Sequence, residues 1–196
     1  MSTLLLAAFV VLLVLAALVV GIYNALVTLR NGFRNAFAQV DVQLKRRHDL
    51  IPNLVETAKG YMAHERQTLE AVIAARAAAT QANIRVTADP SDAAAVGALG
   101  QAEAGLTTAL GRLLAVAENY PQLKADATMR SLMEELTSTE NRIAFSRQAF
   151  NDAVLTYNNR RETFPAVLVA SALGFQPGEF LRIEGEAERQ APKVGF

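Results

Sequence analysis

The chain contains no cysteine and only two histidines, His48 and His64. Without cysteine there is no thiol nucleophile, and the composition fits a reducing compartment. His64-Glu65 begins like the zinc-protease helix motif, but Thr68 stands where the second histidine would have to bind the metal. The two histidines therefore do not form this motif.

Other catalytic patterns are missing as well. A di-iron helical bundle needs Glu-x-x-His pairs, but Lys45 and Tyr61 stand three residues before the two histidines. The sequence has no Gly-x-Ser-x-Gly nucleophile motif and no Walker-type phosphate-binding loop. We therefore predict that the protein is not an enzyme and that it holds no cofactor and no metal.

Charge and aromatic residues are sparse. The 19 basic residues balance the 19 acidic residues, and aromatic residues make up 7% of the chain. Because no dense basic stripe is interleaved with aromatics, we predict no nucleic-acid partner. Residues 1–90 are the more basic part, which suits contact with anionic lipid headgroups near a membrane.

Residues 4–22 read LLLAAFVVLLVLAALVVGI, a run without any charged residue. At about 1.5 Å rise per residue, a helix of this length just crosses a bilayer. A cleaved signal peptide is the alternative, but no Lys or Arg precedes the run and its end lacks the Ala-x-Ala spacing. We therefore predict a short extracytoplasmic N-terminus, residues 1–3, and a retained transmembrane anchor that includes Leu4, Val11, Ala17, Gly21 and Ile22.

The residues after this run indicate its orientation. Positions 23–48 carry five Lys or Arg residues and a single acid, Asp41. By the positive-inside rule, the polar region lies in the cytoplasm and the short N-terminus lies outside. We therefore expect a single-pass membrane protein.

Beyond the anchor, apolar residues recur at helical spacing. With no proline before Pro52, one helix can run from the membrane into the cytoplasm. Asp49 is expected to cap a second helix that has Pro52 in its first turn and runs to about Ala82. Asp89, followed by Pro90, is expected to open a third helix.

Prolines also mark the later boundaries. The third helix is expected to end before Pro121, and a fourth is expected over about residues 126–159. Phe164 stops that helix because it precedes Pro165, and Pro165 starts a short helix that Gly174 closes.

These elements predict an all-α fold. It consists of an N-terminal transmembrane helix, an antiparallel bundle of about four long helices over residues 23–183, and a short C-terminal helix within that range. The tail, residues 184–196, has little to bury and is predicted to be disordered.

Four separated blocks of sequence form a longer pattern: YNALVTLRNGFRNAFAQVDVQLKRRHDLIPNLVETAKGYMAHE, AENYPQLKAD, LTSTENRIAFSRQAFNDAVLTYNN and ETFPAVLVASALGF. In this order they resemble the LemA family of bacterial membrane proteins. The resemblance implies a span of the inner membrane, a cytoplasmic helical bundle and no established enzymatic activity. Related proteins help to organise magnetosome membranes, which implies a role in shaping or scaffolding membrane. The chain departs from the pattern at Phe37, where Trp is expected, and at Arg160 and Arg161, where the family is more apolar.

Two sets of residues are candidates for interaction. The run Lys45, Arg46 and Arg47 is interpreted as a solvated face, with contact to lipid headgroups or to an acidic partner as the alternative. Gly97 and Gly100 lower the helicity of the third helix, which fits a helix against which a neighbour packs closely.

Polar residues also interrupt the apolar helix faces. We expect them to form hydrogen bonds and ion pairs between helices, because a buried charge needs a partner; the alternative is that they form a recognition patch. These residues are Glu65, Arg76, Glu140, Asn141 and Arg142. His64 is interpreted as an ordinary histidine of the bundle.

Two functional hypotheses remain open. The first is a non-enzymatic, self-associating scaffold that organises or shapes membrane, supported by the glycines and by the Ala17-x-x-x-Gly21 spacing in the span. The second is a membrane-anchored adaptor that binds another membrane protein such as a protease. The expected partners are the lipid bilayer, further copies of the chain and, for the adaptor, that other membrane protein.

Overall fold

The computed structural model describes residues 2–183. Within this range it is built from helices, which confirms the predicted all-α fold. Residues 184–196, for which disorder is predicted, lie outside the described range. The helices are α1 (Ser2–Lys59), α2 (Arg66–Ala88), α3 (Ala93–Ala117), α4 (Pro121–Ala125), α5 (Ala127–Glu162) and α6 (Ala166–Ala172).

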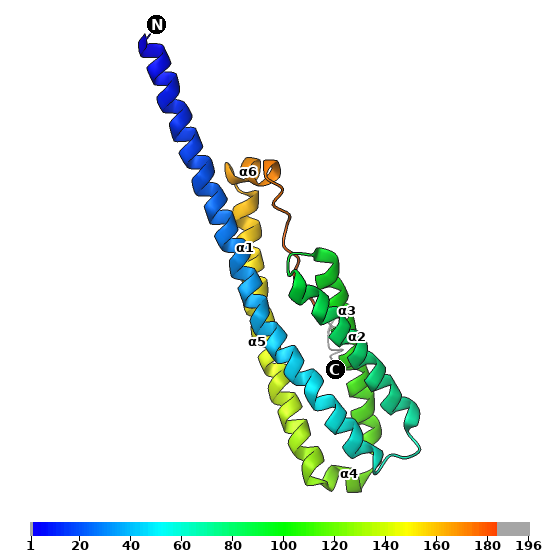
Figure 1. Ribbon diagram of the computed structural model, residues 1–196. Coiled ribbons are helices and arrows are strands. Elements are labelled where there is room, and N and C mark those ends of the chain that lie inside the picture. The colour runs from blue at the N-terminus through cyan, green and yellow to red at the C-terminus, as the bar shows by residue number, and fades with distance from the viewer. Residues whose placement is uncertain (1, 184–196) are drawn as a thin grey trace, which may run out of the picture.

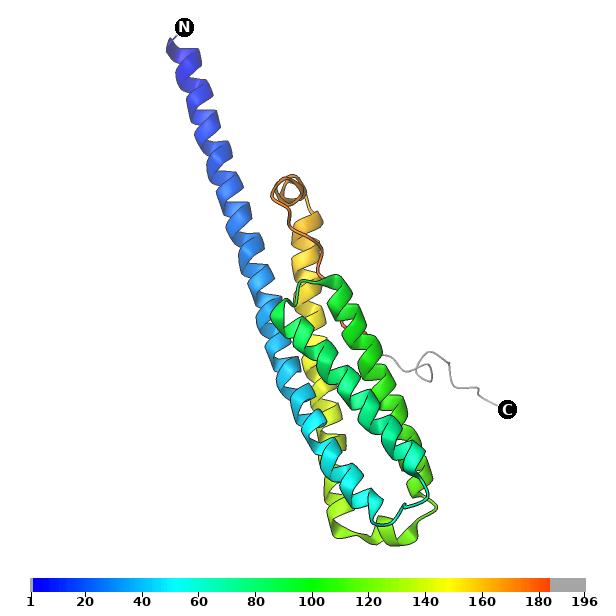
Figure 2. The same cartoon turned by 45° about the vertical axis from the view of Figure 1, so that its right-hand side comes forward.

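The long helices are arranged as two antiparallel pairs (Figures 1 and 2). α1 packs along α5, α2 packs along α3, and α1 also contacts α2. The short helix α4 lies at the end of the bundle farthest from the N-terminus, and α6 lies at the opposite end beside α1. On that side the first part of α1 projects well beyond the bundle.

α1 runs without a break through Asp49 and Pro52, so the prediction of a second helix beginning at Asp49 is wrong. A proline inside a helix lacks the N–H that would bond to the carbonyl four residues earlier, here that of His48. The structure provides another donor, because the Nε–H of Arg76 in α2 donates to the His48 carbonyl oxygen at 2.6 Å. A tertiary contact therefore compensates for the proline.

α3 begins later than predicted, at Ala93, and its cap is Asp92 rather than Asp89. The Asp92 carboxylate accepts a backbone N–H in the first turn of α3, that of Ala94, at 2.9 Å. Asp89 instead accepts the backbone N–H of Ser91 and a guanidinium N–H of Arg34, both at 3.0 Å. The Ser91 bond, with the charge of Arg34, lowers the pKa of Asp89. Asp89 thus stabilises the turn before the helix.

The predicted starts of the last two helices are confirmed. Asp126 caps α5 by accepting the Met129 backbone N–H at 2.9 Å, and it also accepts the Tyr61 hydroxyl at 3.0 Å. These bonds lower the pKa of Asp126, and the contact with the carboxylate raises the pKa of Tyr61. α6 follows Pro165 and ends before Gly174, whose φ of 71° is in the left-handed region that favours glycine.

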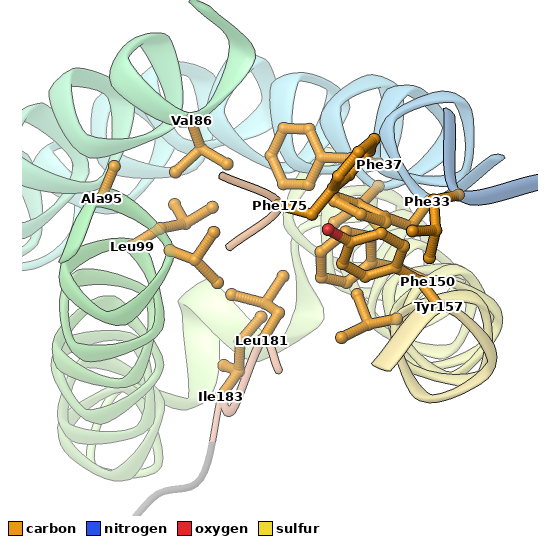
Figure 3. Packing of buried hydrophobic residues seen from close by; sticks show 14 of the residues in the cluster. Phe33, Phe37, Val86, Ala95, Leu99, Phe150, Tyr157, Phe175, Leu181 and Ile183 are labelled. Atoms are coloured by element: carbon orange, nitrogen blue, oxygen red, sulfur yellow. The ribbon is translucent and has the colours of Figure 1, made fainter. Parts of the chain in front are cut away.

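α1 contributes to both of the hydrophobic clusters that form the core. The cluster nearer the projecting segment contains an aromatic group shared by α1 and α5 (Figure 3). In this group the ring centroids of Phe37 and Phe150 are 5.6 Å apart, and those of Phe33 and Tyr157 are 5.2 Å apart. The buried residues of α1 extend from Ile22 to Ala58, so α1 is the central helix of the bundle.

After α6 the chain runs back along the bundle as an extended segment, residues 173–183, which we call the C-terminal segment (Figure 1). The side chain of Asn151 in α5 bonds to both backbone groups of Leu181, at 3.2 and 2.9 Å. On the other side, a Cβ atom at Gly100 of α3 would overlap the carbonyl of Arg182. The C-terminal segment therefore joins α3 to α5.

We expect Arg76→Met to lower the free energy of unfolding by about 1–3 kcal/mol, because the His48 carbonyl would lose its donor. Pro52→Ala restores the backbone N–H, so in that background the cost of Arg76→Met should fall by about 1 kcal/mol or more. Urea unfolding in mild detergent, followed by circular dichroism, would measure all four proteins. If the changes in unfolding free energy caused by Arg76→Met and by Pro52→Ala simply add in the double variant, Arg76 does not replace the missing donor.

Candidate membrane-anchoring site

The projecting part of α1 exposes apolar side chains on all sides. Leu4 is 75% exposed and Val11 is 57% exposed, and Ala17 and Gly21 are exposed as well. Among the described residues, α1 is the one helix with a segment long and apolar enough to cross a membrane. A helix that is apolar all round and has no protein neighbours is typical of a membrane span.

The exposed helix enters the bundle at Ile22. This residue, predicted as part of the anchor, is 5% exposed and belongs to the core. Beside it, the ring of Tyr23 meets the ring of Phe175 edge-on, with 5.6 Å between centroids. The guanidinium carbon of Arg30 lies 5.2 Å from the centre of the Phe175 ring. The C-terminal segment therefore holds α1 at the point where it leaves the bundle.

The end of α5 binds the same segment. The Tyr157 hydroxyl donates to the Gln176 carbonyl at 2.7 Å, and the Nε–H of Arg161 donates to the Phe175 carbonyl at 2.8 Å. Burial raises the pKa of Tyr157, and the positive charge of Arg161 partly offsets this effect. The hydroxyl therefore remains protonated and able to donate.

The predicted basic run, residues 45–47, does not form one solvated face. Lys45 is paired with Asp41 on the same helix at 2.7 Å, and Arg46 is paired with Glu135 of α5 at 2.6 Å. Arg47 is 1% exposed and points into the bundle, so its interpretation as a solvated residue is wrong.

Arg47 is the centre of a buried charged cluster. Its guanidinium contacts Glu103 of α3 and Glu140 of α5, each at 2.6 Å. The other Glu103 oxygen lies 2.8 Å from Nε2 of His48, and the hydroxyl of Thr80 in α2 lies 3.3 Å from Nδ1 of the same ring. This cluster links α1 to the other three long helices.

A second polar contact lies nearer the projecting end of α1. Asp41 is 8% exposed and accepts the side-chain amide of Asn83 at 2.7 Å and the hydroxyl of Thr87 at 3.1 Å, both from α2. Together with Lys45, these donors satisfy the buried carboxylate. The contact ties α1 to α2 at a different height from the Arg47 cluster.

The interhelical role predicted for the polar seam residues is confirmed for Arg76 and Glu140. Glu65 accepts a longer bond, from the Tyr120 hydroxyl at 3.4 Å. Asn141 and Arg142 are exposed on α5 and, among residues 2–183, take part in no side-chain hydrogen bond, so the prediction is not confirmed for them. His64 is exposed in the connection between α1 and α2.

Glu103 was missed, although the sequence carries a signal for it. The apolar seam of α3 is spaced by three and four residues, and Glu103 occupies the position between Leu99 and Leu106. Arg47 occupies the equivalent position between Leu44 and Ile51 of α1. Opposite charges in the seams of two helices predict a buried ion pair, because a buried charge needs a partner.

The two candidate glycines differ in their surroundings. Gly100 lies against the C-terminal segment of the same chain, whereas a Cβ atom at Gly97 would have no neighbour within 4 Å. Among residues 2–183, Gly97 is therefore open and Gly100 is not. Within residues 2–183, no three His, Asp or Glu side chains are grouped to hold a metal ion.

Residues 36–196 match the sequence model of the LemA family. The chain belongs to the LemA family. It is similar to the magnetosome protein MamQ of Magnetospirillum gryphiswaldense, with 30% identity over 173 residues, and to the magnetosome protein MamQ 2 of Paramagnetospirillum magneticum, with 28% identity over 178 residues. These alignments cover 81% and 82% of the chain but 64% of each relative, so the chain spans less than two thirds of their length.

In this LemA-family protein, we expect Arg47→Ala to lower the free energy of unfolding by about 3–5 kcal/mol, because the buried Glu103 carboxylate would lose its guanidinium partner and keep only the contact with His48. Arg46→Ala is the matched control. Its ion pair with Glu135 is partly exposed on both sides, and its loss should cost less than about 1 kcal/mol. Chemical denaturation in detergent would compare the two variants, and equal costs would contradict a structural role for the buried cluster.

Proposed function

We propose that this LemA-family protein is a single-pass membrane protein whose span and central bundle helix are one rigid element. The continuity of α1 is the observation that carries the proposal, because exposed apolar side chains end and buried side chains begin at Ile22 without a break. Residues 4–22 extend over about 28 Å as a helix, close to the ~30 Å hydrocarbon core of a bilayer. The bundle therefore stands in a fixed orientation to the membrane.

We further propose that the bundle lies in the cytoplasm of a bacterial cell and that the N-terminus crosses the inner membrane. The basic residues at positions 23–48 support this orientation. The absence of cysteine allows single labels, placed by Ser2→Cys and by Ser138→Cys on the exposed surface of α5. In spheroplasts, a membrane-impermeant maleimide should label the Ser2→Cys variant, and should label Ser138→Cys only after lysis. The reverse pattern would invert the proposed topology.

The role that we propose is a self-associating scaffold that organises or shapes membrane. Close packing of helices needs small residues, and Gly21 in the span and Gly97 in α3 are exposed, with no neighbour within 4 Å of a Cβ position. Because the span and the bundle are one element, contacts between bundles would act on the bilayer directly. The named relatives are magnetosome proteins, which supports a role in organising membrane.

A groove between α3 and α5 favours the second candidate, an adaptor for another membrane protein. Its cavity of about 310 Å³ is lined mainly by apolar side chains, among them Leu54, Leu110 and Met133. An apolar helix or loop of a partner, such as a membrane protease, could bind there. An adaptor of this kind would work as a monomer.

The mass of the full-length protein in mild detergent would separate the two candidates. The scaffold predicts a discrete particle several times the monomer mass of 21.1 kDa, measured by light scattering after size exclusion. Gly21→Leu and Gly97→Leu should each reduce this mass without loss of stability, because both positions are open. Gly32→Leu, at another open position on α1 beyond the span, should leave the mass unchanged.

A monomer at every concentration would contradict the scaffold and favour the adaptor. Gly100 variants cannot report on assembly, because an added side chain there meets the Arg182 carbonyl of the same chain. If the Gly97→Leu variant keeps the full mass, α3 is not part of the contact between copies.

A further inference from the structure

α6 has a buried face and an exposed face, and both are apolar. Ala166, Val169 and Ala170 belong to the core. On the other side Val167 is 38% exposed and Leu168 is 63% exposed, and the two flanking residues, Phe164 and Leu173, are 80% and 53% exposed. We call the exposed set Phe164, Val167, Leu168 and Leu173 the α6 face. So many large apolar side chains in so short a segment are unusual on a surface that meets water.

The α6 face lies at the height where the membrane span ends. α6 belongs to the same core cluster as Ile22, the first buried residue of α1. Phe175 follows the Leu173–Gly174 turn at the end of α6, and its ring contacts the ring of Tyr23. If residues 4–22 fill the hydrocarbon core, the boundary between hydrocarbon and headgroups falls at about residue 22, beside α6.

The orientation of α6 fits this boundary. In Figure 1 α6 lies across the top of the bundle, and in Figure 2 it is seen end-on while α1 runs down the picture. Its axis is therefore crosswise to α1, in the plane of a membrane that α1 crosses. Helices that bind at a membrane interface lie in this plane, with an apolar side in the interface.

The charges around α6 agree with contact to lipid. Residues 163–178 include no charged residue. Arg160 and Arg161, in the last turn of α5, come just before this stretch, as basic residues commonly do at the boundary of a membrane. Glu162 lies between them and α6 and is paired with Arg161 at 3.6 Å.

We propose that the α6 face is a second membrane contact, inserted into the interface of the leaflet on the bundle's side of the bilayer. The occupant is lipid because α6 packs against α1 and shares a core cluster with Ile22, where the apolar surface of the span ends, so the exposed apolar side chains of the α6 face lie beside that surface. This inference rests on the proposed membrane span of α1. It adds that the bundle meets the bilayer at two places, which restricts both its tilt and its rotation about α1.

The chain has no tryptophan, so single Phe→Trp variants can report the depth of three positions. Phe9→Trp lies in the span, and Phe164→Trp lies in the α6 face. Phe145→Trp is the matched control, because Phe145 is 76% exposed and lies about 25 Å along α5 from the end nearest α6. Leu168→Trp gives a second reporter within α6 itself. Each full-length variant is reconstituted into vesicles of phosphatidylethanolamine and phosphatidylglycerol.

Lipids brominated near the headgroup end of the acyl chain should quench the emission of the Phe164→Trp and Leu168→Trp variants about twofold or more, as expected at interfacial depth. Lipids brominated near the methyl end should quench Phe9→Trp most strongly. Phe145→Trp should be unaffected by either lipid.

The other outcomes separate the two proposals. If Phe9→Trp is quenched but Phe164→Trp and Leu168→Trp are not, the span is inserted and the α6 contact is wrong. Blue-shifted but unquenched emission from both α6 reporters would show that protein, such as a second copy of the chain, covers the α6 face instead of lipid. If Phe9→Trp is not quenched, the proposed span itself fails, and the α6 proposal fails with it.

Discussion

The hydrogen bond from Arg76 to the His48 carbonyl keeps α1 continuous, and the rest of the structure depends on that continuity. Pro52 removes the backbone donor that the carbonyl would otherwise have, and proline inside a helix commonly causes a kink or a break. Because the replacement donor comes from α2, the packing of α2 on α1 compensates for the proline. One helix can then join the projecting apolar segment to both core clusters.

Buried charge determines which helices pack on α1 and in which register. Arg47 meets Glu103 of α3 and Glu140 of α5, whereas Asp41 meets Asn83 of α2. A buried ion pair adds little stability over an apolar pair of the same size, but a misaligned one leaves an unpaired charge at a cost of several kcal/mol. These contacts therefore act mainly by disfavouring wrong pairings and registers of the helices. This matters in a bundle rich in alanine, because small apolar side chains distinguish one helix register from another only weakly.

The proposed membrane attachment depends on the same arrangement. The core cluster that receives Ile22 also receives α6, so the element that leaves the bundle and the element that lies across its end share one set of contacts. Under the proposed attachment, the fold itself sets the orientation of the bundle relative to the bilayer, and no separate partner is needed. A membrane scaffold would need such a defined orientation in order to pack its copies side by side.

The sequence by itself determined the features that depend on local composition. The apolar run of residues 4–22, the helical spacing and the start of a helix near residue 126 were readable because each depends on neighbours within a few residues. The LemA family was readable too, from blocks spread over the chain. The pairing of Arg47 with Glu103 could have been inferred, because both stand at seam positions, but the sequence does not say which helices face each other.

Only the tertiary structure decided the rest. Asp49 and Pro52 carry strong local signals for a helix start, yet a donor from a helix distant in sequence overrides them. Gly97 and Gly100 look alike in the sequence, but the return of the C-terminal segment buries one and leaves the other open. The physical reason is the same in each case: the outcome depends on which backbone groups and charges are brought together from far along the chain, and local preference does not contain that information.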